Sequence, residues 1–291
     1  MSTFTRRDWN KMMLGGLGLA LLPAEGVFAA GPNSKFAGVQ IGAQSYSFRD
    51  MSLDDAIKGY VEVGINSCEL FAGHVEPKGM KPDDLRKWRL SVSLDEFKGV
   101  RKKFDAAGVQ LYAFNYSFRE NYTDAEIERG FQMAQALGVK IITASSNVTT
   151  AKRIDPFAKK YKIRVGMHNH SNIKENEFAT PDDFSNAMKG MSEFICINLD
   201  IGHFTAAGFD AVDFLGKHHD QIVTLHIKDR KKNQGPNVVF GQGDTPIKPV
   251  LDLLKKNKWK IPANIEYEYK GENTIAEMKK CLAYCKKALE S

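Results

Sequence analysis

The sequence predicts one closed barrel of eight parallel strands that alternate with helices, a (β/α)8 or TIM barrel. Three observations predict this fold class. Strand-like and helix-like patterns alternate from residue 36 onward with short connections. The length of 291 residues suits a single barrel of about 250 residues. The first strand is not followed by the glycine-rich turn that is typical of an open, doubly wound nucleotide-binding sheet.

Residues 1–30 have the features of an export signal. Arg6 and Arg7 precede a mildly apolar run, Met12 to Leu22, and small residues close the segment. The paired arginines resemble the twin-arginine signal, although the ordinary secretory route stays open because the usual Phe-Leu is missing. We therefore expect removal of this segment, delivery to the periplasm, and a mature barrel domain, 31–291, without a membrane span.

Eight runs rich in apolar and β-branched residues have the length of buried strands. In chain order they are Val39–Tyr46, Ser67–Phe71, Gln110–Phe114, Lys140–Ala144, Arg164–His168, Ile195–Asp200, Ile222–Ile227 and Asn264–Tyr269. Parallel strands of a barrel all end at the same face, so their last residues are the candidates for a shared site.

Between the strands, apolar residues recur with the helical period of 3.6 residues. The clearest segments are Leu53–Val63, Leu94–Ala107, Asp124–Leu137, Pro249–Lys256 and Thr274–Leu289. Gly64, Gly108 and Gly138 stand where helices commonly end. Ser93 and Thr123 precede acidic residues and look like helix starts.

The composition excludes several classes of protein. The net charge of +6 comes mostly from scattered lysines without an aromatic-interleaved basic stripe, so nucleic-acid binding is not expected. Four cysteines are too few for a disulfide framework, and they lack the spacing of a cysteine zinc site. We expect Cys68 and Cys196 in the core, and Cys281 and Cys285 as buried or free thiols.

The fifth to eighth predicted strands supply a metal-capable side chain each: His168, Asp200, His226 and Glu266. Two imidazoles and two carboxylates without a thiolate suit Mn²⁺, Co²⁺, Zn²⁺ or Fe²⁺ better than Ca²⁺, with Mg²⁺ also a candidate. Such a metal could hold two substrate oxygens and polarise a carbonyl, which acidifies the adjacent C–H.

Other charged strand ends are candidates for catalysis or substrate binding. Glu268 and Glu266 face the same side of the last predicted strand, so either could be the ligand and the other the base. Glu69 comes from the opposite wall as a second acid or base, or as part of a structural ion pair. Lys228 and Asp229 could bind a substrate carbonyl or hydroxyl, or pair with each other.

Polar groups at further strand ends are candidates for substrate binding. They are Tyr46 in the first strand, Asn115 after the third and His170 after the fifth. The segment from Arg230 to Thr245 is long enough for a lid, and its three glycines could hold a phosphate. A turn into the next helix is the preferred interpretation of those glycines.

Five motifs in this order resemble the sugar phosphate isomerase/epimerase superfamily, whose fold is the xylose isomerase-like barrel. They are VGMHNH, LDIGH, LHIKD, GQGD and NIEYE. The resemblance covers essentially the whole chain after the export signal. It implies a small carbohydrate substrate and a divalent metal held by the four strand-end residues named above. It further implies that His203 contacts substrate and that Glu69 makes a polar substrate contact.

The chain departs from that pattern at the fifth strand. Well-studied epimerases of the superfamily have a glutamate where this sequence has His168, and their two glutamates act on the two faces of the substrate. The replacement removes one acid/base group from that face. Glu69, Glu268 and His170 are the candidates for the missing role.

The sequence thus predicts a metal-dependent sugar isomerase or epimerase that removes a proton next to a carbonyl. A lyase or dehydratase that uses the same enolisation on a keto-sugar or keto-glycoside is the alternative. Export favours a substrate without phosphate. A periplasmic sugar-binding protein would need the polar strand ends without the metal. Homo-oligomerisation is left open.

Overall fold

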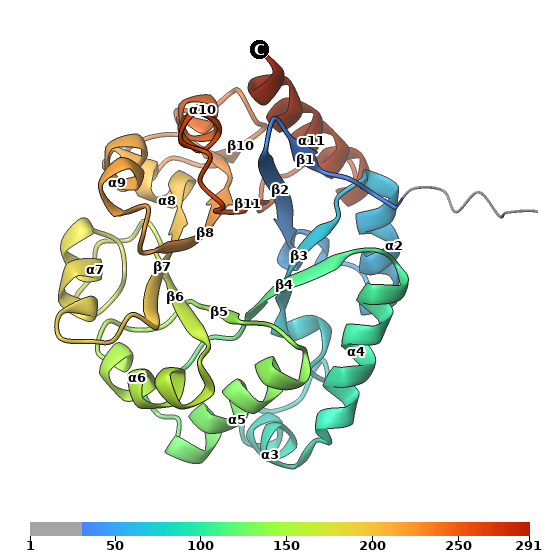
Figure 1. The fold of residues 1–291 in the computed structure, drawn as a ribbon, viewed down its shortest axis with the longest axis vertical. Coiled ribbons are helices and arrows are strands. Elements are labelled where there is room, and N and C mark those ends of the chain that lie inside the picture. Colours follow the sequence, from blue (N-terminus) through green and yellow to red (C-terminus); the bar gives the residue numbers. More distant parts are fainter. Residues whose placement is uncertain (1–30) are drawn as a thin grey trace, which may run out of the picture. The chain divides into compact units, whose positions relative to one another are not determined.

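The computed structural model describes residues 31–291, and the predicted export signal lies outside these described residues. Eight parallel strands form the centre of Figure 1, and helices form a ring around them. The strands are β2 (Val39–Gln44), β3 (Ser67–Phe71), β4 (Gln110–Asn115), β5 (Ile141–Ala144), β6 (Arg164–His168), β7 (Ile195–Asp200), β8 (Ile222–Ile227) and β11 (Ala263–Ile265).

Parallel pairing between β2 and β3 closes the barrel. The strand order runs from β2 through β11, β8, β7, β6, β5 and β4 to β3, and β2 also pairs with β3 in parallel. A short strand, β1 (Lys35–Phe36), adds to β2 in the antiparallel direction. A separate antiparallel pair joins β9 (Asp229–Arg230) to β10 (Asn237–Val238). The predicted (β/α)8 barrel is confirmed.

The outer ring consists of helices that connect successive strands (Figure 1). They are α2 (Leu53–Val63), α3 (Pro82–Ser91), α4 (Leu94–Ala106), α5 (Asp124–Ala136), α6 (Thr150–Tyr161), α7 (Pro181–Met188), α8 (Ile201–Ala206), α9 (Ala211–His218), α10 (Ile247–Asn257) and α11 (Thr274–Glu290), with short 3₁₀ turns η1 (Ser45–Phe48) and η2 (Ala72–His74). Within residues 31–291, no helix is both long and apolar enough to span a membrane.

The last barrel strand is shorter than the sequence predicts. We expected a strand over Asn264–Tyr269, but the ladder ends at Ile265. Beyond it, the Glu266 amide still donates to the carbonyl of Ile227 at 3.0 Å, and the Tyr267 amide then turns to the Ser47 hydroxyl at 2.9 Å. A side-chain acceptor thus replaces the neighbouring strand at this point.

The residues of β7 show how the core is divided. Ile195, Ile197 and Leu199 belong to the main apolar core, whereas Cys196 belongs to a separate small cluster with residues of β4, β5 and β8. Asn198 and Asp200 follow Cys196 at a spacing of two, so they share its face of the strand. That face changes along its length from apolar to polar to charged. All four cysteines are buried and free, as expected.

A buried carboxylate ties two outer helices together. Glu126 forms a capping box with Thr123 at the start of α5, and it pairs with Arg86 of α3 at 2.7 Å. Its side chain is only 3% exposed. The hydrogen bond from Arg86 is the main reason why the pKa of Glu126 falls to about 2.

We predict that Glu126→Ala lowers the free energy of unfolding by about 2 kcal/mol at neutral pH, because cap and ion pair are both lost. The depressed pKa stabilises the fold above the unfolded value of about 4.3, and this contribution disappears as pH falls toward about 2. Urea unfolding between pH 3 and 7 tests this. Asp95→Ala, which removes an exposed pair with Lys98, is the control and should cost less than about 1 kcal/mol.

Candidate metal and substrate site

Four side chains from the ends of neighbouring strands converge at one end of the barrel. His168 ends β6, Asp200 ends β7, His226 lies in β8 and Glu266 follows β11. One ligand atom from each lies within 4.8 Å of all the others, and all four residues are buried. Ligands that share one ion at about 2.0–2.2 Å have a similar spread.

The facing atoms of this four-residue cluster lack aligned hydrogen bonds within the described residues, although His226 Nδ1 lies 3.2 Å from Glu266 Oε2. His168 Nδ1, Asp200 Oδ2, His226 Nδ1 and Glu266 Oε2 are buried atoms without a hydrogen-bond partner among residues 31–291. Buried polar atoms in folded proteins are nearly always satisfied, so four orphans that face one another require an explanation. The donor set of two nitrogens and two oxygens matches a divalent transition metal. The cluster could therefore hold a metal ion.

Lys228 places a positive charge beside the cluster. Its ammonium lies 3.2 Å from Asp200 Oδ2, 2.7 Å from Glu266 Oε2 and 2.5 Å from Glu268 Oε2. The contact with Glu268 has hydrogen-bond geometry, whereas the other two are ion-pair distances without suitable alignment. Glu266 and Glu268 thus face the same cation, as expected from their spacing, although both lie beyond the strand.

Burial and neighbouring charge set the protonation states. Burial lowers the pKa of His168 well below its usual value, so its ring is neutral, and burial raises the pKa of Asp200 to about 6. Burial disfavours the charged forms of His226, Lys228 and Glu266. The opposite charges of their neighbours favour those forms and have the larger effect on each pKa. The pKa values of His226 and Lys228 therefore rise, and that of Glu266 falls. Because a ligand imidazole must be neutral, a bound metal would displace the proton from His226.

Glu69 lies inside the barrel beneath the cluster. Its carboxylate contacts His226 Nε2 at 2.9 Å and accepts hydrogen bonds from Thr143 at 2.6 Å and Asn264 at 3.0 Å. It is fully buried and does not line the hollow above the cluster. This position suits a carboxylate that fixes the orientation of a ligand histidine. The predicted acid/base role of Glu69 stays a prediction.

A polar layer that was not predicted from the sequence surrounds Glu69. Asn198 contacts His226 Nε2 at 3.2 Å, and Asn264 donates to Thr224 at 2.9 Å. Asn198, Thr224 and Asn264 each stand two residues before a member of the four-residue cluster. Because side chains in a strand alternate between its faces, this spacing was the signal that could have identified them.

His203 lies between two cations. Its Nε2 is 3.1 Å from the Lys228 ammonium, and its Nδ1 is 2.6 Å from the Arg230 guanidinium. Burial first, and then the charge of Lys228, lowers the pKa of His203 well below its usual value. A neutral imidazole has one lone pair, so it can accept from only one of these two donors at a time.

A hollow of about 360 Å³ lies over the cluster at the carboxyl ends of the strands, and we call it the site hollow. Its lining includes the predicted site residues Tyr46, Asn115, His168, His170, His203, His226, Lys228, Glu266 and Glu268. It also includes Gln44, Phe71, Ser117, Arg119 and Ser145, which were not among the predicted site residues.

Asp229 is not among the residues that line the site hollow. Its buried carboxylate accepts backbone hydrogen bonds from Gly241 at 2.7 Å, Gly243 at 2.9 Å and Thr245 at 3.3 Å. The structure therefore does not support the predicted substrate contact, because this side chain organises the loop after β10. The same bonds engage the amides of two of the glycines considered for a phosphate, in agreement with the preferred interpretation as a turn.

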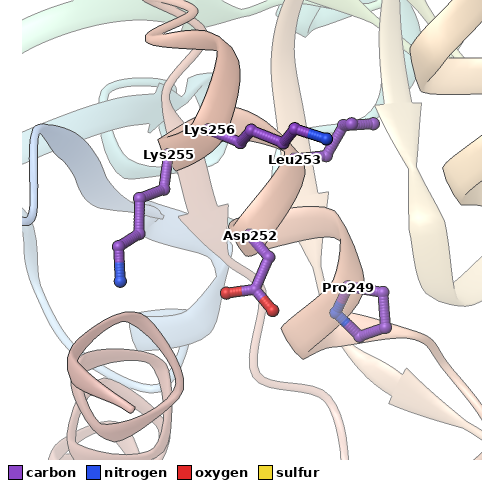
Figure 2. Close-up of a pocket in the computed structure, with 5 residues that line it drawn as sticks. All are labelled: Pro249, Asp252, Leu253, Lys255 and Lys256. Atoms are coloured by element: carbon purple, nitrogen blue, oxygen red, sulfur yellow. The ribbon is translucent and has the colours of Figure 1, made fainter.

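Another hollow lies away from the strand ends. Figure 2 shows it along α10, where it is lined by Pro249, Asp252, Leu253, Lys255 and Lys256. One outer helix supplies all of these residues, and Lys255 already donates to the carbonyl of Leu289 in α11 at 2.5 Å. The four-residue cluster has no part in this hollow.

Comparison with known proteins identifies the family. A family model described as xylose isomerase-like TIM barrel matches residues 60–287 of the 291-residue chain. The chain therefore belongs to the xylose isomerase-like TIM-barrel family.

The chain is also similar to individual proteins. An inosose dehydratase from Mesomycoplasma hyopneumoniae is 23% identical over 290 residues, with 81% of this chain and 88% of that protein covered. A sugar phosphate isomerase/epimerase structure from Parabacteroides distasonis has a TM-score of 0.61 at 21% identity, covering 85% of this chain and 95% of that one. A probable 3-DHS dehydratase from Bacillus anthracis has a TM-score of 0.63 at 13% identity, covering 84% and 98%.

We predict that Gly202→Ala disturbs the position of Lys228. A Cβ at Gly202 would lie 2.3 Å from Lys228 Cγ and 2.8 Å from its carbonyl oxygen, so backbone and side chain must both shift. We expect a loss of about 1–3 kcal/mol in the free energy of unfolding. Gly216→Ala in α9 is the control, because a Cβ at Gly216 would meet no atom within 4 Å and alanine favours the helix. Equal effects of the two substitutions in thermal unfolding would contradict this explanation.

Proposed function

We propose that the protein is a metal-dependent enzyme that removes a proton next to the carbonyl of a sugar or sugar derivative, as an isomerase or epimerase. The observation that carries the proposal is the set of four buried, convergent ligand atoms that make no hydrogen bond within residues 31–291 and lie beside a charged lysine and a further carboxylate. His168, Asp200, His226 and Glu266 would hold the ion. When bound, a divalent ion in this site polarises a carbonyl and stabilises the enolate that follows.

The remaining groups divide the proton transfer between them. Lys228 stays protonated because three carboxylates raise its pKa, so we assign it to donate a hydrogen bond to the substrate carbonyl or enolate oxygen. Glu268 lines the site hollow, its side chain is 24% exposed, and we assign it as the base. His170 lies in the lining with a pKa that burial lowers, so its neutral ring is a second candidate.

A dehydratase or lyase is the second candidate. Within residues 31–291, the carboxylates in the lining of the site hollow are Glu266 and Glu268, which lie on one side and face Lys228. Epimerisation needs acid/base groups on two faces, whereas loss of a hydroxyl after enolisation can proceed from one. The relationship to an inosose dehydratase at 23% identity favours the same outcome.

Metal content tests the site directly. We predict about one divalent ion per chain after exposure to Mn²⁺, Co²⁺ or Zn²⁺ and dialysis. Asp200→Asn should lower metal affinity by more than about 100-fold, because the charge is lost while an oxygen remains to cap α8. Asp210→Asn, at the equivalent cap of α9, is the matched control and should retain the ion. If the protein binds none of these ions, the four residues form a polar pocket without a metal. A sugar-binding protein would then be the better proposal.

Hydrogen exchange between keto-sugars and solvent tests the base. We predict that Glu268→Gln keeps the metal and lowers the rate of exchange by about 10²–10⁴-fold. Glu69→Gln should instead weaken metal binding by about 10–100-fold, because the amide no longer matches its three donors around His226. Unchanged exchange in Glu268→Gln would remove Glu268 from the catalytic set. Loss of water from the substrate, followed by mass spectrometry, would distinguish dehydratase from isomerase.

A further inference from the structure

A hollow of about 380 Å³, which is not the one along α10, adjoins the site hollow at the same face of the barrel. We call it the second hollow. The two hollows share Arg119, Ser145, His170 and His203 in their linings. Two imidazoles and a guanidinium lie where the hollows adjoin, and we call the pair of hollows the trough. The polar lining that belongs to the second hollow alone consists of Ser146, Asn147, Ser171, Asn172, Lys174 and Glu177.

The walls of the second hollow are held in place by hydrogen bonds between the loops after β5 and β6. Asn147 and Glu177 form an isolated antiparallel bridge. The Val148 amide and the Asn147 side chain both donate to the carbonyl of Asn176 at 3.2 Å, and the His170 amide donates to Phe178 at 2.8 Å. The bridge and the two bonds to Asn176 join loops that come from different strands, whereas the His170 bond lies within the loop after β6. A ligand therefore meets a hollow whose shape is already formed, which lowers the entropic cost of binding.

Ser146 carries a specific sign of a missing partner. It lines the second hollow, is only 9% exposed, and its hydroxyl has no hydrogen-bond partner among residues 31–291. A buried hydroxyl without a partner costs about 1–3 kcal/mol. A polar ligand group that reaches this hydroxyl from the second hollow would remove that cost.

The chemistry of the lining favours a neutral, hydroxyl-rich ligand. Serine hydroxyls and asparagine amides both donate and accept, as sugar hydroxyls do. Arg119 and Lys174 bring positive charge, but Glu177 places a carboxylate in the same hollow. An anionic group such as phosphate would have to lie near that carboxylate, whereas a sugar ring can bond to all three.

We propose that the second hollow is a subsite for a second sugar unit, so that the substrate is a glycoside of two sugar rings. The reacting ring lies over the four-residue cluster, and the glycosidic linkage passes over His170 and His203, whose rings pack edge to face 5.4 Å apart at the boundary of the two hollows. This inference deepens the proposed function and rests on it, because it presumes that the first ring reacts beside Lys228 and Glu268.

Titration calorimetry on the metal-loaded protein compares glucose and methyl β-glucoside with cellobiose, maltose and trehalose. We expect at least one disaccharide to bind at least about 10-fold more tightly than either single ring. Ser146→Ala should lower that affinity by about 3–10-fold, with a smaller effect on the single rings. Ser91→Ala, at an exposed serine at the end of α3, is the matched control and should leave both affinities unchanged.

Three results would overturn the subsite. Disaccharides that bind no more tightly than single rings would show that one ring fills the trough. Equal effects of Ser146→Ala on both ligand sizes would remove the hydroxyl from the subsite. Inorganic phosphate that competes with disaccharide, and loses this effect in Lys174→Ala, would identify an anion site. In each case, metal binding and proton exchange on single rings would persist if the proposed function holds. Their loss would show that the proposed function had failed as well.

Discussion

The ion pairs of one lysine hold the candidate site together. Lys228 has almost no contact with water, and three carboxylates from β7 and from the segment after β11 surround its ammonium. An unpaired charge in such a place costs several kcal/mol, and removing one partner from a buried pair typically destabilises a protein by about 3–5 kcal/mol. The strands that carry these groups must therefore end at the same level along the barrel axis. The ion pairs of the site thus depend on the register between neighbouring strands.

The barrel interior is built in layers that serve this arrangement. Beneath the charged residues lies the polar layer around Glu69, and below that a small apolar cluster that includes Cys196. Room for the polar layer comes from residues without side chains. A Cβ at Gly42 would lie 2.1 Å from Asn264 Oδ1, and one at Gly166 would lie 3.2 Å from Asn198 Cβ. Each glycine thus allows a neighbouring side chain to occupy the interior.

Local patterns predicted much of the fold, because strand length, helix period and capping residues act over a few neighbours. Ser67–Phe71, Arg164–His168, Ile195–Asp200 and Ile222–Ile227 begin and end where the sequence predicted. The four metal-capable residues were found because parallel strands bring their ends together. The contacts of Glu69 could not be predicted, because they depend on the barrel radius and on residues up to 195 positions away. The bonds of Asp229 depend on how the next loop folds back, and no short motif encodes that.

The second hollow could not be predicted from the sequence, because it too depends on contacts between distant parts of the chain. Two loops without a periodic pattern form its walls, and the bridge that joins them connects Asn147 to Glu177, which are far apart in the chain. Serines and asparagines in loops usually stabilise turns, so their presence alone indicates no ligand. Only the tertiary arrangement shows that Ser146 is buried without a hydrogen-bond partner in the part of the chain that the structure describes.

The single lone pair of His203 makes the site sensitive to its own contents. When a ligand takes the Lys228 ammonium, the imidazole is left to Arg230. The Arg230 guanidinium also donates a hydrogen bond to the carbonyl of Gly235 at 2.7 Å, within the turn that joins β9 to β10. The one lone pair of His203 is therefore shared between a lysine that lines the site hollow and an arginine that holds the turn between β9 and β10.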